Sequence, residues 1–235
     1  PPYPPLPQSD SRAGETGTHP GPAQWEASQG PNAAGAARLP LPSVMPTAAH
    51  PTSTSSRADL AKAIADASLL RGTFTLRSGR TSNYYLDKYL FSTRPEVLRE
   101  LAVLFAERIA AMQDRAGVPV KRLAGAELGG IPLVTAASLQ TGLPCLFIRN
   151  SKKDYGTAKQ LEGKLDKGDT VILLEDVATT AGQALEAGEG LKDLWATGLG
   201  VIAAIDRQEG AAENMRAAGV PFEALFTKRD LGINE

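Results

Sequence analysis

The stretch VILLEDVATTAGQALEAG, residues 171–188, constrains the fold more than any other part of the chain. It opens with the apolar run 171–174, which is typical of a strand buried on both faces of a parallel sheet. Two carboxylates, Glu175 and Asp176, follow directly, and a turn of small residues comes next at 177–182. A helical pattern begins after the turn. This order predicts a buried strand that ends in two acids and leads through a short turn into a helix.

Such an arrangement can hold a sugar phosphate. Carboxylates accept hydrogen bonds from ribose hydroxyls or hold a hydrated Mg²⁺ ion. Thr hydroxyls and the free backbone N–H groups at the helix start, near Gln183, can bind a phosphate with the help of the helix dipole. The alternative is purely structural, since many α/β proteins have a strand that ends in an acid and a glycine-containing turn without a ligand there. The stretch is not a Walker A loop, because no Gly-Lys-Ser/Thr follows it.

Composition narrows the class of protein. The 235 residues are 42% hydrophobic and 22% charged, which suits one ordinary domain plus extra chain. The net charge of -1 gives no support for nucleic acid as a partner. The single cysteine, Cys145, excludes an intramolecular disulfide framework and favours a reducing cytoplasm. No run of about 18 apolar residues predicts a membrane span, and no secretory signal pattern is found.

Residues 1–56 differ from the rest of the chain. They contain 12 of the 17 prolines, and Gly, Ala, Ser and Thr fill most other positions. Apolar side chains are too sparse there to offset the entropy of ordering, so we expect a disordered tail followed by one domain at 57–235. Both histidines, His19 and His50, lie in the tail. Their absence from 57–235 excludes Ser-His and Cys-His catalysis there and argues against a zinc site.

The first part of the predicted domain reads as a helix, a hairpin and a long helix. Ser56 and Asp59 form a capping-box pattern for a helix that we expect to end at Gly72. Short strands are expected at 74–76 and 84–86, around a turn at 78–82. A long amphipathic helix then begins at Pro95, with its apolar face formed by Val97, Leu98, Leu101, Leu104, Phe105, Ile109 and Met112.

From about residue 122 strand and helix patterns alternate, which predicts a parallel sheet with helices on both faces. The expected strands are 122–126, 144–149, 171–174, 199–205 and 222–226, and the expected helices 131–140, 183–195 and 211–218. Ligands of such sheets lie at the carboxyl ends of the strands. The charged residues that fall there are Glu127, Arg149, Glu175, Asp176, Asp206 and Arg207.

A long polar segment, 150–164, separates two of the predicted strands. From Arg149 to Lys164 it carries five basic residues against two acids. One interpretation is a solvated excursion, which is common for loops between core strands. The other is a mobile cationic lid that closes over an anionic ligand, excludes water and neutralises departing charge.

Five motifs, taken together, resemble orotate phosphoribosyltransferases, a family of type I phosphoribosyltransferases. EDVATTAGQ is similar to the motif for phosphoribosyl pyrophosphate (PRPP), and RNSKKDYGTAKQLEG to the catalytic loop. FTLRSGRTSNYYLDKYLFSTRP resembles the N-terminal hood that closes over the pyrimidine, where a hairpin with core residues would be the alternative. AIDRQEG and GAELGGIPL are the two remaining matches. The five occur in the family's order from about residue 60 to 233.

The resemblance implies an α/β, type I phosphoribosyltransferase fold: a central, mostly parallel sheet flanked by helices, a small N-terminal hood and a flexible catalytic loop. It implies transfer of the phosphoribosyl group of PRPP to orotate, which gives orotidine 5′-monophosphate and pyrophosphate. It also implies Mg²⁺ as cofactor, held through PRPP and water with no direct protein ligand. The partners implied are small-molecule substrates and a second copy of the chain, whose site the loop completes, with no nucleic acid and no membrane.

The resemblance also assigns residues. Catalytic roles fall on Lys153, Asp176 and Arg149. PRPP binding falls on Arg77, Arg149, Lys152, Lys153, Tyr155, Glu175, Asp176, Val177, Ala178, Thr179, Thr180, Ala181, Gly182 and Gln183. Orotate binding falls on Tyr85, Leu86, Thr179 and Arg207. Arg207 suits the orotate carboxylate through a bidentate fork, and a surface pair with Glu209 is the alternative for this side chain.

The sequence departs from the family pattern in four places. Asn150 stands where a second basic residue is usual after Arg149, and Lys152 is placed to compensate for it. Arg77 replaces the usual Lys before Ser-Gly, Asn83 replaces a common Pro, and Tyr155 stands where some members have His. These departures concern the rate and the chemistry of the loop more than the reaction.

Two other functions are compatible with parts of this pattern. A purine phosphoribosyltransferase would share the central motif but would lack the paired aromatic residues of the hood and the KDYGT segment of the loop. A regulator that senses PRPP without catalysis would be expected to lose the acid pair or the cations of the loop and to carry a DNA-binding segment. Glu175, Asp176 and Lys153 are all present, and the tail has only Arg12 and Arg38 as basic residues.

The loop assignment yields a prediction about Lys153. Replacing it with Ala removes a cation that would stabilise the departing pyrophosphate, so turnover should fall by orders of magnitude while the protein stays folded. Steady-state kinetics together with circular dichroism check this. An unaltered rate would remove the loop from the mechanism.

Overall fold

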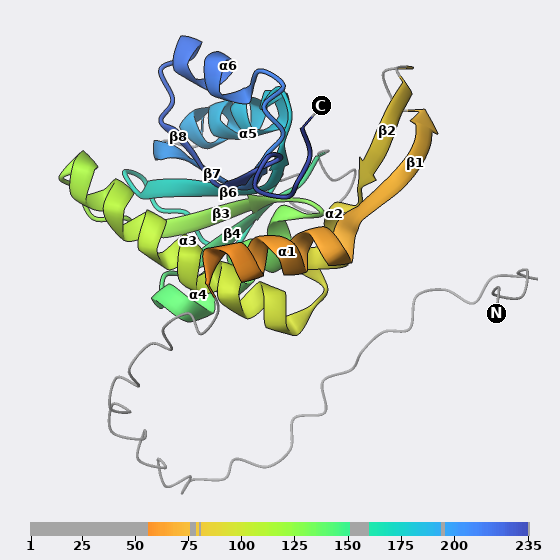
Figure 1. Ribbon diagram of the computed structural model, residues 1–235. Helices are drawn as coiled ribbons and strands as arrows, with labels where there is room; N and C mark the ends of the chain where they lie inside the picture. Colours follow the sequence, from red (N-terminus) through yellow and green to blue (C-terminus); the bar gives the residue numbers. More distant parts are fainter. Residues whose placement is uncertain (1–55, 76–78, 80, 151–159, 194–195, 235) are drawn as a thin grey trace, which may run out of the picture. The chain divides into compact units, whose positions relative to one another are not determined.

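Six strands form one sheet in the computed structural model, which describes residues 56–75, 79, 81–150, 160–193 and 196–234 (Figure 1). The strand order is β5-β4-β3-β6-β7-β8; the last five of these run parallel, and β5 is antiparallel to β4. The predicted mostly parallel sheet is therefore confirmed. The bounds are β3 Arg122–Ala126, β4 Cys145–Ile148, β5 Leu161–Glu162, β6 Thr170–Ala178, β7 Thr197–Asp206 and β8 Phe222–Thr227.

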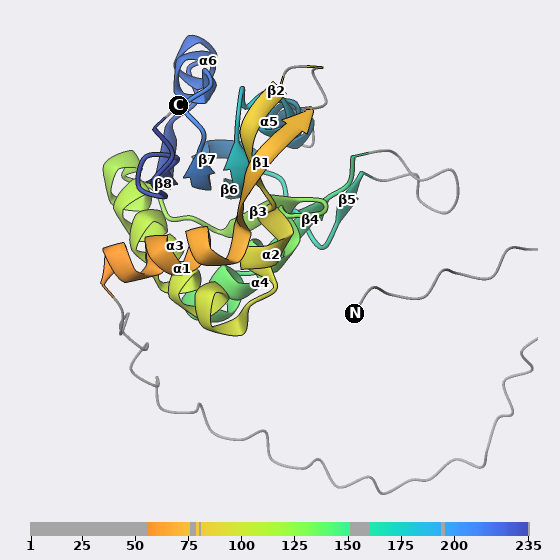
Figure 2. The ribbon, with the colours of Figure 1, turned by 45° about the vertical axis from the view of Figure 1, so that its right-hand side comes forward.

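Helices cover both faces of this sheet (Figures 1 and 2). One face packs against α1 (Arg57–Ser68), α3 (Pro95–Ala116) and α4 (Gly130–Thr141), and the other against α5 (Gly182–Asp193) and α6 (Ala211–Ala217). Side chains alternate between the two faces of a strand. In β6, Ile172 and Leu174 therefore join one apolar cluster, whereas Val171 and Leu173 join the other. This double burial explains why the run 171–174 has no polar residue.

Strand β6 continues further than the sequence indicates. The turn was expected at 177–182, but Val177 and Ala178 belong to the strand, because their Cα atoms pair in register with Ile205 and Asp206 of β7. The two acids thus lie inside the strand rather than after it. Helix α5 begins at Gly182, one residue before the expected start.

The N-terminal part differs from the expectation in one element. Ser56 and Asp59 form the expected capping box, but α1 ends at Ser68 instead of Gly72. The chain turns there into β1 (Leu69–Thr75), which forms an antiparallel hairpin with β2 (Thr81–Leu86). Leu70, expected on the apolar face of the helix, is 43% exposed and pairs in register with Tyr85. The pairing of β1 with β2 therefore outweighs the helical pattern of the local sequence at residues 69–72.

Two short elements carry no sequence signal. Helix α2 (Lys88–Ser92) follows the hairpin, and its first turn is capped by Asp87, whose carboxylate accepts a hydrogen bond from the Tyr89 N–H at 3.1 Å. Strand β5 lies at the outer edge of the sheet beside β4 (Figure 2). Helix α3 begins with Pro95 in its first turn, as predicted, and its expected apolar face packs in the core.

The tail prediction concerns residues 1–56, of which 1–55 lie outside the described residues, so it stays a prediction. The predicted domain starts where α1 starts, at Arg57. Within the described part of the chain, no helix combines the length and apolar character that a bilayer crossing needs.

A tight backbone contact fixes α4 against the sheet and yields a prediction about Gly125 in β3. A Cβ atom added there would lie 2.5 Å from the Gly130 carbonyl oxygen and 2.7 Å from Val134 Cγ1. Gly125→Ala should therefore destabilise the protein by about 1–3 kcal/mol, the usual range for overpacking. Urea denaturation measures the free energy of unfolding.

Gly188→Ala is the matched control for this change. Gly188 lies inside α5, and a Cβ atom added there meets nothing within 4 Å. Since Ala favours a helix over Gly by about 0.5–1 kcal/mol, this variant should be as stable as the wild type or more so. Equal stability of the two variants would contradict the proposed contact between β3 and α4.

Candidate active site

The two acids of β6 lie almost completely out of solvent. Glu175 is 9% exposed and Asp176 is fully buried. Around them the parallel strands bring Glu127 after β3, Arg149 after β4 and Arg207 after β7 to the same edge of the sheet. The expected gathering of charged residues at the carboxyl edge is therefore confirmed.

Three neighbours hold the Asp176 carboxylate. The Val177 N–H donates to Oδ1 at 2.6 Å, and the Lys88 ammonium donates to Oδ1 at 3.3 Å. The same ammonium lies 3.0 Å from Oδ2 but out of line for a hydrogen bond, so Oδ2 has an ion-pair partner without a hydrogen bond. Oδ2 also lies against Gly129, where an added Cβ atom would be only 1.5 Å away. Gly129 is therefore required for the carboxylate to occupy this position.

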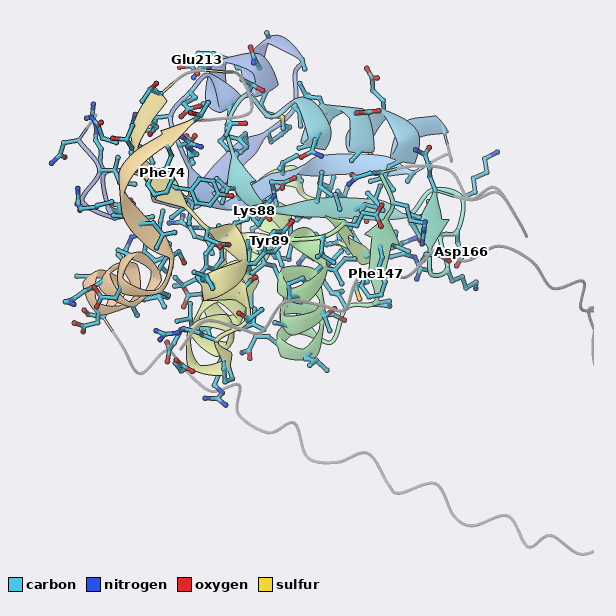
Figure 3. The ribbon with its side chains drawn as sticks, turned by 90° about the vertical axis from the view of Figure 1, so that its right-hand side faces the viewer. Phe74, Lys88, Tyr89, Phe147, Asp166 and Glu213 are labelled. Atoms are coloured by element: carbon cyan, nitrogen blue, oxygen red, sulfur yellow. The ribbon has the colours of Figure 1, made fainter. Side chains whose placement is uncertain are left out.

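Lys88 comes from an element that the sequence did not indicate. It is the first residue of α2, and Figure 3 shows Lys88 and Tyr89 between the hairpin that carries Phe74 and the central sheet. Its Nζ atom also lies 5.6 Å from the centroid of the Tyr89 ring. The one signal for this residue is its place inside the segment 74–95 that resembles the family's hood. None of the site assignments from sequence included it.

Burial and charge shift the proton affinities of this cluster. Burial raises the pKa of Glu175 to about 8, and its hydrogen bond and charge interaction with Asp176 act in the same direction, whereas Lys88 opposes them. For Lys88, burial lowers the pKa, but the charge and hydrogen bond of Asp176 outweigh it, so that its pKa is raised above the usual value. In the ligand-free protein at neutral pH the pair therefore carries less than two negative charges.

The turn after β6 is open to solvent. Thr180, Gly182 and Gln183 are exposed, whereas Ala181 is buried and takes a left-handed backbone conformation with φ of 62°. The Thr180 carbonyl accepts a hydrogen bond at 2.9 Å from the Asn214 amide of α6, which fixes the turn. The N–H groups in the first turn of α5 have no partners within the helix, which makes this an anion-binding position.

Arg207 links the sheet to the hairpin. Its Nη2 atom donates to the Tyr84 hydroxyl at 3.1 Å and lies 2.8 Å from Glu209 Oε1, and its guanidinium carbon lies 5.4 Å from the centroid of the Tyr84 ring. The pair with Glu209, raised as the alternative, is therefore present. Its buried Nε atom has no hydrogen-bond partner among the described residues. This leaves a donor at the site that a ligand can use.

The predicted hood residues face in different directions. Tyr85 is 45% exposed and its ring lies 5.7 Å from that of Phe74, whereas Leu86 is buried in the apolar core. Tyr84, which was not predicted as a site residue, is the hairpin aromatic that contacts Arg207. Alternation along β2 puts Tyr84 and Leu86 on one face and Tyr85 on the other. Arg77, assigned to PRPP, lies outside the described residues.

The base of the predicted catalytic loop is well defined. The Arg149 N–H donates to the Gln160 carbonyl at 2.8 Å, and the Arg149 guanidinium lies 3.9 Å from Glu162 Oε1. Asn150 joins this base to the turn before α4: its N–H donates to Glu127 Oε1 at 2.7 Å and its side-chain amide to the Glu127 carbonyl at 3.3 Å. Lys152, Lys153 and Tyr155 lie outside the described residues.

Comparison with known proteins identifies the family. No family model matches the sequence. The orotate phosphoribosyltransferase of Natronomonas pharaonis, however, is 42% identical over 174 residues, which are 74% of this chain and 95% of the relative. The chain belongs to the orotate phosphoribosyltransferase family. The match therefore favours the orotate enzyme over a purine phosphoribosyltransferase, the second function that the sequence left open.

Solved structures agree with this assignment. The orotate phosphoribosyltransferase of Mycobacterium tuberculosis in complex with Fe(III) dicitrate is 30% identical, with a TM-score of 0.66 over 75% of this chain and 99% of that one. The same enzyme in complex with PRPP is 29% identical, with a TM-score of 0.62 over 75% and 99% of the two chains. The fold is therefore that of type I phosphoribosyltransferases, as the sequence predicted.

The raised pKa of Glu175 yields a prediction about stability. The carboxyl has a pKa of 4.5 when unperturbed and about 8 in the fold, so the folded state binds the extra proton between these values. Its contribution to stability is therefore complete below pH of about 4.5 and is lost as the pH rises through about 8.

Comparison with Glu175→Gln isolates this contribution, because Gln keeps the shape but does not titrate. As the pH rises from about 5 to about 9, an interval that spans the two pKa values, the ligand-free wild type should lose stability relative to the variant. The quantity compared is the free energy of unfolding. Urea denaturation at several pH values measures it. A difference that stays constant over this range would show that Glu175 has an ordinary pKa.

Proposed function

We propose that this protein transfers the phosphoribosyl group of PRPP to orotate and releases pyrophosphate. One observation carries the proposal: in a chain of this family, β6 delivers two buried acids directly to an exposed turn and a helix N-terminus. Acids for the ribose hydroxyls and N–H groups for the 5′-phosphate thus follow each other on one continuous segment.

Each part of the substrates has a suitable group at this edge. Glu175 and Asp176 accept hydrogen bonds from the ribose hydroxyls, and the segment from Val177 to Gln183 takes the 5′-phosphate. Arg207 takes the orotate carboxylate, because a guanidinium matches a carboxylate with two parallel hydrogen bonds. For orotate, Tyr85, Leu86 and Thr179 stay predictions from the family resemblance.

The reaction requires little covalent chemistry from the protein's side chains. Ribosyl transfer through an oxocarbenium-like state needs stabilisation of the departing pyrophosphate and exclusion of water. Arg149, at the base of the loop, would stabilise the departing pyrophosphate together with Lys153 and Tyr155 of the predicted loop. Closure of that loop would exclude water from the site.

Mg²⁺ is the cofactor that we propose. Two adjacent carboxylates suit a hydrated ion that arrives with PRPP, and the described residues contain no group of three acidic, His or Cys side chains that would hold a metal by themselves. Glu175 and Asp176 would hold the ion through water and substrate oxygens. When bound, Mg²⁺ would offset part of the pyrophosphate charge.

We further propose a homodimer in the cytoplasm, in which the catalytic loop of one chain completes the site of the other. The resemblance of the segment from Arg149 to Lys164 to the family's catalytic loop supports the dimer, and the single cysteine favours a reducing compartment. Light scattering of the purified full-length chain measures the mass in solution, and a monomer that turns over would contradict shared sites.

The loss of orotate absorbance tests the function directly. Purified protein, PRPP and Mg²⁺ should consume orotate and should leave adenine, hypoxanthine and uracil unchanged in parallel reactions. Consumption of another base would contradict the hood assignment while keeping the fold. Tight binding of PRPP without turnover of any base would favour the regulatory function.

Arg207 yields the prediction that separates the two substrates. Because a hydrogen bond to a charged group contributes about 1.5–3 kcal/mol, Arg207→Met should raise the KM for orotate about tenfold to hundredfold. The KM for PRPP should stay close to that of the wild type. Steady-state kinetics with each substrate varied in turn measure both values.

Two further variants control for the hairpin contact. Arg207→Lys keeps the charge but loses the fork, so its KM for orotate should lie between those of the wild type and Arg207→Met. Tyr84→Phe removes the hydroxyl that accepts from Arg207 and leaves the guanidinium in place. If Tyr84→Phe raised the KM for orotate as much as Arg207→Met, the guanidinium would act only as a support for the hairpin.

A further inference from the structure

Lys88 is a cation that the family resemblance did not assign to any role. It lies between two parts of the site, since α2 follows the hood strand β2 and packs beside the carboxyl edge of the sheet. Its side chain is 33% exposed, whereas that of Asp176, its ion-pair partner, is 1% exposed. The ammonium therefore faces the buried acids on one side and solvent on the other.

Charge balance requires such a cation. Burial of an ionised carboxylate is costly unless it is paired and hydrogen-bonded, and two carboxylates side by side repel each other. In the described part of the chain, Lys88 is the cation that interacts with both acids: it lies 3.0 Å from Asp176 Oδ2, and its charge lowers the pKa of Glu175. The charged and titratable groups around it are Glu175, Asp176 and Tyr89.

The contact with Lys88 also fixes the position of the Asp176 carboxylate. Gly129 and the Val177 N–H limit the Asp176 carboxylate on two sides, and Lys88 contacts both of its oxygens from a third element. Without the ammonium, Oδ2 would have neither an ion-pair nor a hydrogen-bond partner among the described residues. Among the described residues, the Val177 N–H would then be the remaining hydrogen-bond donor to this carboxylate.

We propose that Lys88 is a positioning residue for PRPP: it fixes the Asp176 carboxylate for the ribose hydroxyls and balances the charge of the acid pair. This inference rests on the proposed function. It also gives α2 a reason to lie where it does, because one short segment then carries the aromatic hairpin for the base and the cation for the ribose acids.

The test compares PRPP affinity in four proteins by isothermal titration calorimetry with Mg²⁺ and without orotate. Lys88→Met removes the charge and keeps the apolar stem, and Lys88→Arg keeps the charge. Lys62→Met is the matched control, since Lys62 forms an ion pair with Asp66 on the exposed side of α1, with 74% and 60% of the two side chains exposed.

Lys88→Met is expected to weaken PRPP binding at least about tenfold, because it leaves a buried charge without its partner. Lys88→Arg should bind within about threefold of the wild type, and Lys62→Met should bind like the wild type. In steady-state kinetics, Lys88→Met should raise the KM for PRPP and leave the KM for orotate nearly unchanged. Equal PRPP affinity in Lys88→Met and the wild type would overturn the inference, as would an equal loss in Lys88→Arg.

A double-mutant cycle tests whether Lys88 acts through Asp176. In the Asp176→Asn background, adding Lys88→Met should change PRPP affinity by less than about threefold, because the interaction is already gone. A persistent tenfold loss would mean that Lys88 contacts PRPP itself, which would overturn the positioning role.

An unfolded variant and a wild type that does not bind PRPP are two outcomes that require separate treatment. If circular dichroism shows that Lys88→Met is unfolded, Lys88→Gln replaces it, since Gln keeps a hydrogen-bond donor without the charge, and the same tenfold loss is expected. If the wild type itself does not bind PRPP, the proposed function fails. If the wild type binds PRPP and the Lys88 variants bind equally well, only the present inference fails.

Discussion

The change of character along β6 is the constraint on which the rest of the structure depends. Four residues of the strand are apolar on both faces, and the next two are acids that remain in the sheet. The apolar part requires helices on both sides, which α3 to α6 supply. The acidic part requires compensation at one end, and the neighbouring elements provide it: a glycine at the start of α4, an N–H group of the strand itself and an ammonium from α2.

The hairpin and α2 give the site a second layer that does not belong to the sheet. Tyr84 of β2 accepts a hydrogen bond from Arg207, and Lys88 of α2 pairs with Asp176. Two contacts thus tie one continuous segment to the ends of two neighbouring strands, β7 and β6. The sites proposed for the base and for the ribose are consequently linked, because Tyr84 and Lys88 belong to one continuous chain segment. A displacement of the hairpin would disturb both sites.

Local patterns were sufficient for most of the fold. The strands β3, β7 and β8 and the helix α4 were predicted within about two residues, and the start of α3 at Pro95 was predicted as well, because burial repeats with the period of the element. The end of β6 was missed because Glu175 and Asp176 resemble loop residues, and only pairing with β7 keeps Val177 and Ala178 in the sheet. Lys88 was missed for a similar reason: its partner is 88 residues away in the sequence, and no local pattern records such a contact. The motif assigned Tyr85 and Leu86 to orotate, but the contact of Tyr84 with Arg207 depends on which face of β2 meets the sheet.

Gly129 has a consequence for how this site can vary in sequence. Its Cα atom lies so close to Asp176 that any side chain would occupy the volume of the carboxylate. The position therefore offers no route to new specificity, either in natural divergence or in a mutational library. Its neighbour Leu128 is 63% exposed and is free of that restriction. Substitutions at Leu128 can therefore vary the surface beside the acid pair without filling the space that the Asp176 carboxylate occupies.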